Sequence, residues 1–413
     1  MTADTGLEVG VDPEGAGFER SRLERLTEHF ETRYVSTGKI AGCQIAVARR
    51  GKTAYWRSLG LMDAERSKPV DEGTIWRIYS MTKPITSVAL MQLYEQGRFQ
   101  LTDPLHRYIP EWRGLKVGEL TSDGSVRSVD SIRPVSVRDA LTHMTGLVGG
   151  VSPGHPLDER FAEELRAARH GMTLERVCSL LAGYPLKFQP GTRWNYGLST
   201  DVCARLVEIM SGRPFDEYLR AHIFGPLGMV DSGFVVPDES RSRLAACYLY
   251  QPGGLPKLID DPKSSPYRRR RSYLSGSGGL VATTADYLRF CQMLVNRGQL
   301  DGTRIIGRKT LELMVTNHLP GDAELGQLAT GGFGEAEFPG VGFGLGFGVG
   351  RGPGATASAG SAGEFYWGGA ASTAFWVDPV EDLTVVFMTQ LLPSATYPFR
   401  AQLRALVYQA LAD

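Results

Sequence analysis

Cysteine is scarce in this chain of 413 residues, and no two cysteines stand close together. There are five, an odd number, and none forms a C-x-x-C pair. A disulfide framework or a zinc cluster needs paired or closely spaced cysteines, so this pattern argues against both. Buried, reduced thiols are expected instead, as in proteins of a reducing compartment. The five are Cys43, Cys178, Cys203, Cys247 and Cys291.

An excess of charge of one sign and long apolar runs are also missing. The 45 basic and 45 acidic side chains cancel, so no attraction to nucleic acid or to an anionic membrane is expected. No run of about 18 apolar residues predicts a membrane span. Residues 1–18 lack a basic start and an apolar core, which predicts no secretory signal and a cytoplasmic protein. The seven histidines show no H-x-x-x-H spacing, and neither a metal nor an organic cofactor is expected.

The overall composition is that of an ordinary globular protein, and the spacing of apolar residues predicts different secondary structure along the chain. Apolar spacing predicts an opening helix over 18–34 and strands over 42–49 and 53–59. The middle is helical and rich in loops. One helix is expected to start just before Pro84 and to end at Gly97, and others are expected over 137–142, 174–181 and 200–210. The last third predicts strands over 343–349, 364–367, 373–377 and 383–388, then a helix over 401–411. Two glycine-rich stretches, 321–339 and 352–363, are expected to be mobile surface loops.

This order predicts an α+β fold in which both chain ends share one antiparallel sheet, flanked by the first and last helices. The sheet domain would comprise residues 1–72 and 275–413, and residues 73–274 would form an inserted, mainly helical domain. An active site is expected at the seam between the two.

Ser80-Met81-Thr82-Lys83 is an S-x-x-K tetrapeptide where a polar segment enters an apolar helix. Residues at i and i+3 share a helix face, so the hydroxyl and the amine would lie together. A serine needs a nearby base to become a nucleophile, and a desolvated lysine is a candidate for that role. Taken alone, the tetrapeptide is equally typical of a helix-capping serine followed by a surface lysine.

The flanking sequence favours the catalytic interpretation. Ordered segments follow one another along the chain: IYSMTKP at 78–84, LTHMTGL at 141–147, PGTRWNY at 190–196, FGPLGM at 224–229 and GGL at 278–280. Together they resemble the β-lactamase-like serine hydrolases over roughly residues 40–390. The resemblance implies that Ser80 is the nucleophile and that Lys83 and Tyr196 form its proton-transfer partner. A buried core tyrosine is the other interpretation of Tyr196.

Two positions depart from the β-lactamase pattern. β-Lactamases carry asparagine two residues after the tyrosine, where this chain has Leu198. Trp367-Gly368-Gly369 lies where they carry Lys-Thr-Gly, so the cation that meets a substrate carboxylate is missing. The W-G-G segment resembles the family VIII carboxylesterases. Trp367 could alternatively be an aromatic side chain packed on a sheet face.

The same resemblance implies the rest of the site. The backbone N–H groups of Ser80 and Ala370 would form an oxyanion hole. The pocket would be lined by Trp367, Gly368, Gly369, Tyr79 and Leu198. Three other features are interpreted as structural: Ser277 as part of a glycine turn, His143 as a core or loop histidine, and the arginines at 268–271 as a solvated loop or an interface patch.

The expected activity is hydrolysis of carboxylic esters, with short to medium acyl chains, through an acyl-Ser80 intermediate. A small-molecule ester is the expected partner. The sequence does not indicate the oligomeric state. The alternatives are a β-lactamase or D-alanyl peptidase, an acyltransferase of the same fold, and a non-catalytic binding protein on the same scaffold.

Overall fold

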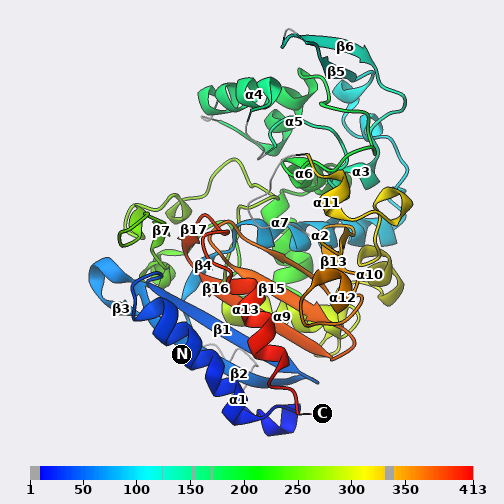
Figure 1. Ribbon diagram of the computed structural model, residues 1–413. Coiled ribbons are helices and arrows are strands. Elements are labelled where there is room, and N and C mark those ends of the chain that lie inside the picture. Colours follow the sequence, from blue (N-terminus) through cyan, green and yellow to red (C-terminus); the bar gives the residue numbers. More distant parts are fainter. Residues whose placement is uncertain (1–9, 123, 151–153, 169–170, 331–338, 413) are drawn as a thin grey trace.

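The computed structural model describes residues 10–122, 124–150, 154–168, 171–330 and 339–412, and an eight-stranded antiparallel sheet forms its centre. The strand order is β12-β13-β14-β15-β16-β1-β2-β3, so strands from the two ends of the chain share one sheet (Figure 1). The predicted α+β arrangement is therefore confirmed. The strands are β1 (Gly42–Arg49), β2 (Lys52–Asp63), β3 (Lys68–Pro69), β12 (Val341–Phe343), β13 (Gly348–Gly350), β14 (Phe365–Gly368), β15 (Ala374–Asp378) and β16 (Leu383–Thr389).

Strand β1 joins the two halves of the sheet. One edge pairs with β2, and the other pairs with β16 from Cys43 opposite Thr389 to Arg49 opposite Leu383. All eight residues of β1 are buried because helices cover both faces of the sheet. Ile45 and Val47 pack on one face, whereas the alternate residues Ala46 and Ala48 belong to the core on the other face.

Two helices from opposite ends of the sequence cover the first face. α1 (Arg20–Phe30) and α13 (Phe399–Tyr408) lie side by side across the sheet (Figure 1). The other face is covered by α9 (Thr284–Val295), which contacts β1, β15 and β16. The end of the described chain also contacts the segment before α1, because Ala412 N–H donates to the Gly17 carbonyl oxygen.

The helical part of the chain packs around α2 (Thr82–Glu95), which contacts α6 (Ser199–Ser211) closely. The other helices of this part are α3 (Val137–Leu141), α4 (Pro156–Ala167), α5 (Leu174–Ala182), α7 (Phe215–Leu219) and α8 (Gly225–Leu227). Short strand pairs complete the region: β5 (Lys116–Leu120) with β6 (Val126–Asp130), β4 (Ile75–Arg77) with β9 (Val281–Thr283), and β7 (Cys247–Leu249) with β8 (Lys257–Asp260) and β17 (Leu391–Leu392). Figure 1 shows the β5–β6 hairpin at the end of the molecule farthest from α1.

The single strand predicted over 343–349 is wrong, because this stretch is the hairpin β12–β13. Gly344 N–H donates to the Phe347 carbonyl oxygen and Gly346 adopts a positive φ of 94°, which closes a tight turn. A Cβ on Gly346 would lie 2.1 Å from Ser87 Oγ on α2. The glycines therefore allow the tight turn and its close approach to α2. They do not form one closely packed face of a continuous strand.

The two predicted loops are partly regular. The first contains α11 (Leu325–Leu328), whose start is closed by a capping box between Glu324 and Gln327. The second begins with α12 (Pro353–Thr356). Residues 331–338 of the first stretch lie outside the described residues.

The cysteines and the arginine run at 268–271 were also the subject of sequence predictions. All five cysteines are buried and none is joined to another, as predicted. The arginine run makes local contacts: Arg270 binds the Asp216 carboxylate through two bonds of 3.0 Å, and Arg271 lies over the Tyr267 ring.

None of the helices in the described part of the chain combines the length and apolar character needed to cross a membrane. Within the same residues, no three His, Cys, Asp or Glu side chains cluster as metal ligands would.

The remaining short elements lie near the sheet. They are β10 (Gln299–Leu300), β11 (Thr303–Arg304) and α10 (Arg308–Met314).

Candidate active site

Ser80 lies in a single 3-10 turn, Tyr79–Met81, that connects β4 to α2. The predicted helix begins at Thr82, just before Pro84 as expected, and ends before Gly97 as predicted. Tyr79 adopts a positive φ of 42°, an unusual backbone conformation for a bulky residue. Strain of this kind immediately before a half-exposed serine is common at functional sites. The Tyr79 hydroxyl contacts Cys247 Sγ at 3.7 Å.

Lys83 is a buried lysine in the first turn of α2, with only 4% of its surface exposed. Its Nζ donates to Ser80 Oγ at 3.3 Å and to the Ser277 carbonyl oxygen at 2.8 Å. The alternative interpretation of the tetrapeptide, with a lysine on the surface, is therefore wrong. Ser277 lies in the turn expected there, but sequence reasoning missed that its carbonyl oxygen holds the lysine.

Tyr196 lies beside this pair, just before α6. The Lys83 Nζ is 4.3 Å from the centre of the Tyr196 ring. The Tyr196 phenol oxygen accepts a hydrogen bond of 3.0 Å from Trp367 Nε1, which comes from β14. The structure thus brings together four residues that the sequence singled out: Ser80, Lys83, Tyr196 and Trp367.

An aromatic cluster holds Tyr196 from the other side. Trp194 stacks on its ring with centroids 5.6 Å apart, and the His143 ring lies 4.9 Å away. His143 is itself buried and contacts Thr200 Oγ1 through Nε2 at 3.3 Å. Burial, reinforced by the charge of Lys83, holds the pKa of His143 well below its usual value. His143 is therefore a neutral packing neighbour of the tyrosine, in keeping with its structural interpretation.

The expected oxyanion donor Ala370 lies in the turn after β14. This turn is closed by Gly369 N–H, which donates to the Thr373 carbonyl oxygen. A Cβ on Gly369 would lie 2.5 Å from the Ile78 carbonyl oxygen, so only glycine permits this approach to the segment that carries Ser80. The turn and the serine are therefore neighbours in space, although far apart in sequence.

The other predicted pocket residues are placed as follows. Leu198 occupies the position before the first residue of α6 without a capping hydrogen bond from its side chain, and it lies against Gly149 in the preceding loop. Gly368 lies under the Arg400 guanidinium, where a Cβ would be 2.2 Å from Nη2. Neither has a polar group that could replace the missing asparagine or the missing lysine.

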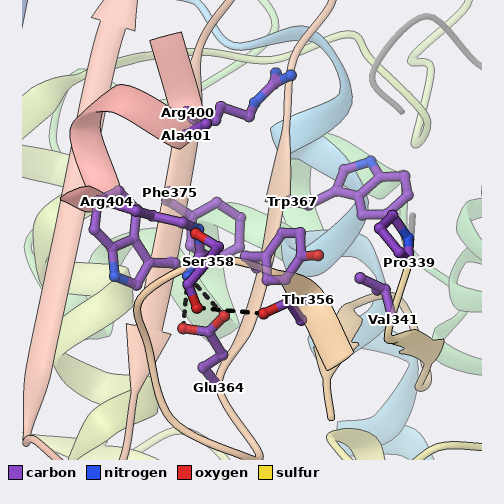
Figure 2. Close-up of a pocket in the computed structure, with 13 residues that line it drawn as sticks. Pro339, Val341, Thr356, Ser358, Glu364, Trp367, Phe375, Arg400, Ala401 and Arg404 are labelled. Atoms are coloured by element: carbon purple, nitrogen blue, oxygen red, sulfur yellow. Dashed lines mark hydrogen bonds and ion pairs between the residues drawn. The ribbon is translucent and has the colours of Figure 1, made fainter. Parts of the chain in front are cut away.

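A separate cavity of about 190 Å³ lies against α13 (Figure 2). Arg404 and Glu364, joined by hydrogen bonds of 2.6 Å, line one part of it, and Trp367 lines another. The catalytic candidates Ser80, Lys83 and Tyr196 are not among its lining residues. Trp367 thus contributes both to this cavity and to the site around Ser80.

A half-exposed serine beside a buried lysine and tyrosine, in a fold whose central sheet is built from both chain ends, defines a serine hydrolase of the β-lactamase fold. The family model described as beta-lactamase matches residues 24–409, and the chain belongs to this family.

Individual relatives agree with this assignment. Protein Rv1367c of Mycobacterium tuberculosis (strain ATCC 25618 / H37Rv) is 30% identical, over 86% of this chain and 87% of the relative. Esterase EstB of Burkholderia gladioli is 27% identical, over 97% of this chain and 99% of the esterase. The solved structure of EstCE1, described as a hydrolase with promiscuous acyltransferase activity, superposes with a TM-score of 0.77 at 27% identity, covering 94% of this chain and 99% of EstCE1. The chain is thus related to the family VIII esterases.

Proposed function

We propose that this protein is a carboxylic ester hydrolase that works through an acyl-Ser80 intermediate. The observation that carries the proposal is the 3.3 Å hydrogen bond from Lys83 Nζ to Ser80 Oγ, with Tyr196 packed beside the lysine. Its substrates would be small neutral esters with short to medium acyl chains. The site would lie between the sheet portion, residues 1–72 and 275–413, and the inserted helical portion, residues 73–274.

In the proposed acylation, Ser80 Oγ bonds to the ester carbonyl carbon while its proton passes to the Tyr196–Lys83 pair. The backbone N–H groups of Ser80 and Ala370 would donate to the oxyanion of the tetrahedral intermediate. The bond to the alkoxy oxygen then breaks, and the alcohol leaves with the proton. Water repeats the sequence on the acyl ester, releasing the carboxylic acid and restoring the Ser80 hydroxyl.

The choice of an ester over a β-lactam rests on what replaces the polar contacts of β-lactamases. Trp367 directs its indole N–H to Tyr196 and offers no cation for a substrate carboxylate. Leu198 packs against Gly149 and offers no amide. The name of the relative EstB, an esterase, supports the same choice.

An acyltransferase is the second candidate, because EstCE1 is described as having promiscuous acyltransferase activity. Transfer and hydrolysis share the acyl-Ser80 intermediate and differ only in whether water or another hydroxyl compound attacks it. The amount of water admitted at deacylation would decide between them.

The test is a panel of p-nitrophenyl esters of increasing chain length, assayed with wild-type protein beside a chromogenic cephalosporin. Rapid release of p-nitrophenol with little cephalosporin turnover supports the proposal, whereas the reverse overturns it. A parallel assay adds a primary alcohol at rising concentration and measures the free acid and the new ester by chromatography. A new ester that dominates at low alcohol concentration would instead assign the protein as an acyltransferase.

A further inference from the structure

Asp201 is a buried carboxylate that the proposed reaction does not use. It lies in the first turn of α6, the helix that follows Tyr196, and its side chain is fully buried. Its Oδ1 accepts hydrogen bonds from the Tyr273 hydroxyl at 2.9 Å and from Ser275 Oγ at 2.8 Å. Both donors come from one segment on the far side of α6. Hydrogen bonds to a carboxylate are among the stronger ones in proteins, so Asp201 fixes this segment firmly.

The fixed segment leads directly to the proposed base. Ser275 Oγ accepts from Ser277 N–H at 3.3 Å, and the Ser277 carbonyl oxygen accepts from Lys83 Nζ at 2.8 Å. Lys83 Nζ in turn donates to Ser80 Oγ. A continuous path of hydrogen bonds therefore joins the buried carboxylate to the nucleophile through one turn of backbone.

The same turn is anchored to the helix that carries the lysine. Thr86 Oγ1, one turn along α2 from Lys83, donates to the Gly276 carbonyl oxygen at 2.8 Å. Asp201 holds one side of the turn to α6, and Thr86 holds the other side to α2. The Ser277 carbonyl oxygen is thereby kept at a fixed place relative to both helices.

We propose that Asp201 is a positioning residue for the proton-transfer unit: by holding Ser275, it places the Ser277 carbonyl oxygen that orients Lys83 toward Ser80. The proposal rests on the proposed function, because it assigns Lys83 a part in proton transfer. A lysine side chain has four rotatable bonds, and one fixed acceptor restricts its nitrogen to the position where it meets the serine. Displacing a reacting group by about 1 Å costs on the order of 100-fold in rate.

Two variants separate this path from general stability. Ser275→Ala breaks the path because it removes both a donor to Asp201 and the acceptor of Ser277 N–H. Tyr273→Phe removes the other donor to Asp201 and leaves the path intact. We therefore expect Ser275→Ala to lower kcat by about 10- to 100-fold with KM within about twofold. Asp201→Asn keeps the Oδ1 acceptor but loses the charge that strengthens its hydrogen bonds, so kcat should fall by a smaller factor, again with little change in KM. Tyr273→Phe should have a clearly smaller effect on kcat.

Asp286→Asn is the matched control. Asp286 is also a buried acid in the first turn of a helix, and it accepts from Asp231 N–H and Ser232 Oγ, neither of which belongs to the path from Asp201 to Lys83. Its removal should leave kcat unchanged. The kinetic assays use p-nitrophenyl butyrate, at least 10 °C below the lowest melting temperature in the set.

The double variant Asp201→Asn/Ser275→Ala decides whether the two residues act through one path. Its kcat should equal that of the more damaged single variant, because the second change breaks a path already broken. Three results would each overturn the proposal. They are a normal kcat in Asp201→Asn, losses of the two single variants that multiply in the double variant, and an equal fall in kcat for Ser275→Ala and Tyr273→Phe. If Asp201→Asn does not fold, the comparison of Ser275→Ala with Tyr273→Phe still decides. Ester turnover that survives in Ser80→Ala would instead contradict the proposed function itself.

Discussion

The indole Nε1 of Trp367 donates a hydrogen bond to the phenol oxygen of Tyr196 at 3.0 Å, and both side chains are at most 5% exposed. A hydrogen bond donated to a phenol oxygen stabilises the phenolate more than the phenol. The tryptophan that replaces the lysine of β-lactamases is thus linked to the proton-transfer unit as well as to the pocket wall.

Trp367→Phe tests this link, because it keeps an aromatic ring and removes the N–H donor. The loss of one hydrogen bond of this kind is worth about 1–2 kcal/mol, so kcat should fall about 5- to 30-fold. The kcat–pH profile should also shift to higher pH, since the Tyr196 phenolate loses a hydrogen-bond donor. The measurement is kcat and KM for p-nitrophenyl butyrate across pH 5–10.

Trp376→Phe is the control for this prediction. Trp376 is also buried, on the neighbouring strand β15, and within the described part of the chain its Nε1 has no hydrogen-bond partner. A change in KM alone for Trp367→Phe would limit Trp367 to the pocket wall, and equal effects of the two variants would make it a packing residue.

Ser80→Ala should abolish ester hydrolysis, with a loss of about 10⁴-fold or more, because the nucleophilic route disappears. A fluorophosphonate should add its mass to Ser80 in the wild type and to nothing in the variant, as read by intact-mass spectrometry. Ser277→Ala should still hydrolyse esters and be labelled, since Lys83 contacts the backbone of Ser277 and not its side chain. Turnover retained by purified Ser80→Ala would place the nucleophile elsewhere.

Lys83→Ala and Tyr196→Phe should each slow acylation by about 100-fold or more, in line with the loss of an acid–base group. Because the two groups move one proton together, the double variant should be little worse than either single one. Stopped-flow release of p-nitrophenol in the first turnover measures acylation directly. Losses that multiply would mean that the two residues act separately.

The stability of the fold should depend on Asp286 in a defined pH range. Burial raises the pKa of Asp286 from its ordinary value of 3.8 to about 7 in the folded protein. Between these two values the folded state holds a proton that the unfolded state has lost. The contribution of Asp286 to stability is therefore full below pH 4 and falls as pH rises to about 7, by at most about 1.4 kcal/mol per pH unit.

Urea unfolding of wild type and Asp286→Asn at half-unit steps from pH 4.5 to 8 measures this difference. The free energy of unfolding of wild type relative to the variant should decline up to about pH 7 and then level off. A constant difference across the series would show that Asp286 is already ionised in the folded state.

Elements with a strong local pattern were predictable from the sequence. The strand expected at 42–49 is β1, and the helix expected at 174–181 is α5 to within one residue. Alternating or helical apolar spacing and a local cap, such as Thr173 Oγ1 accepting from Arg176 N–H, set these boundaries. The S-x-x-K pair was likewise predictable, because the 3-10 turn that carries Ser80 runs directly into α2, so that Ser80 and Lys83 lie close together as i and i+3 residues do.

What the sequence could not predict depends on contacts between distant segments. The turn at Gly346 is explained by Ser87 on α2, and the short strands β4 and β9 exist only because they pair with each other. In the site, the Ser277 carbonyl and the Trp367 indole reach their partners through the tertiary fold. No local pattern indicates such contacts, although the run of small residues at 275–279 marks a segment that packs tightly.

The pairing of β1 with β16 also sets the order of events during synthesis. β1 leaves the ribosome well before β16, the strand that covers its second edge, because the two strands lie far apart along the chain. Until then β1, apolar on both faces, presents an unpaired edge that could join another nascent chain. Contacts this distant in sequence also slow folding. The central strand should therefore be where a molecular chaperone is needed most, and a chain stopped short of residue 383 should aggregate.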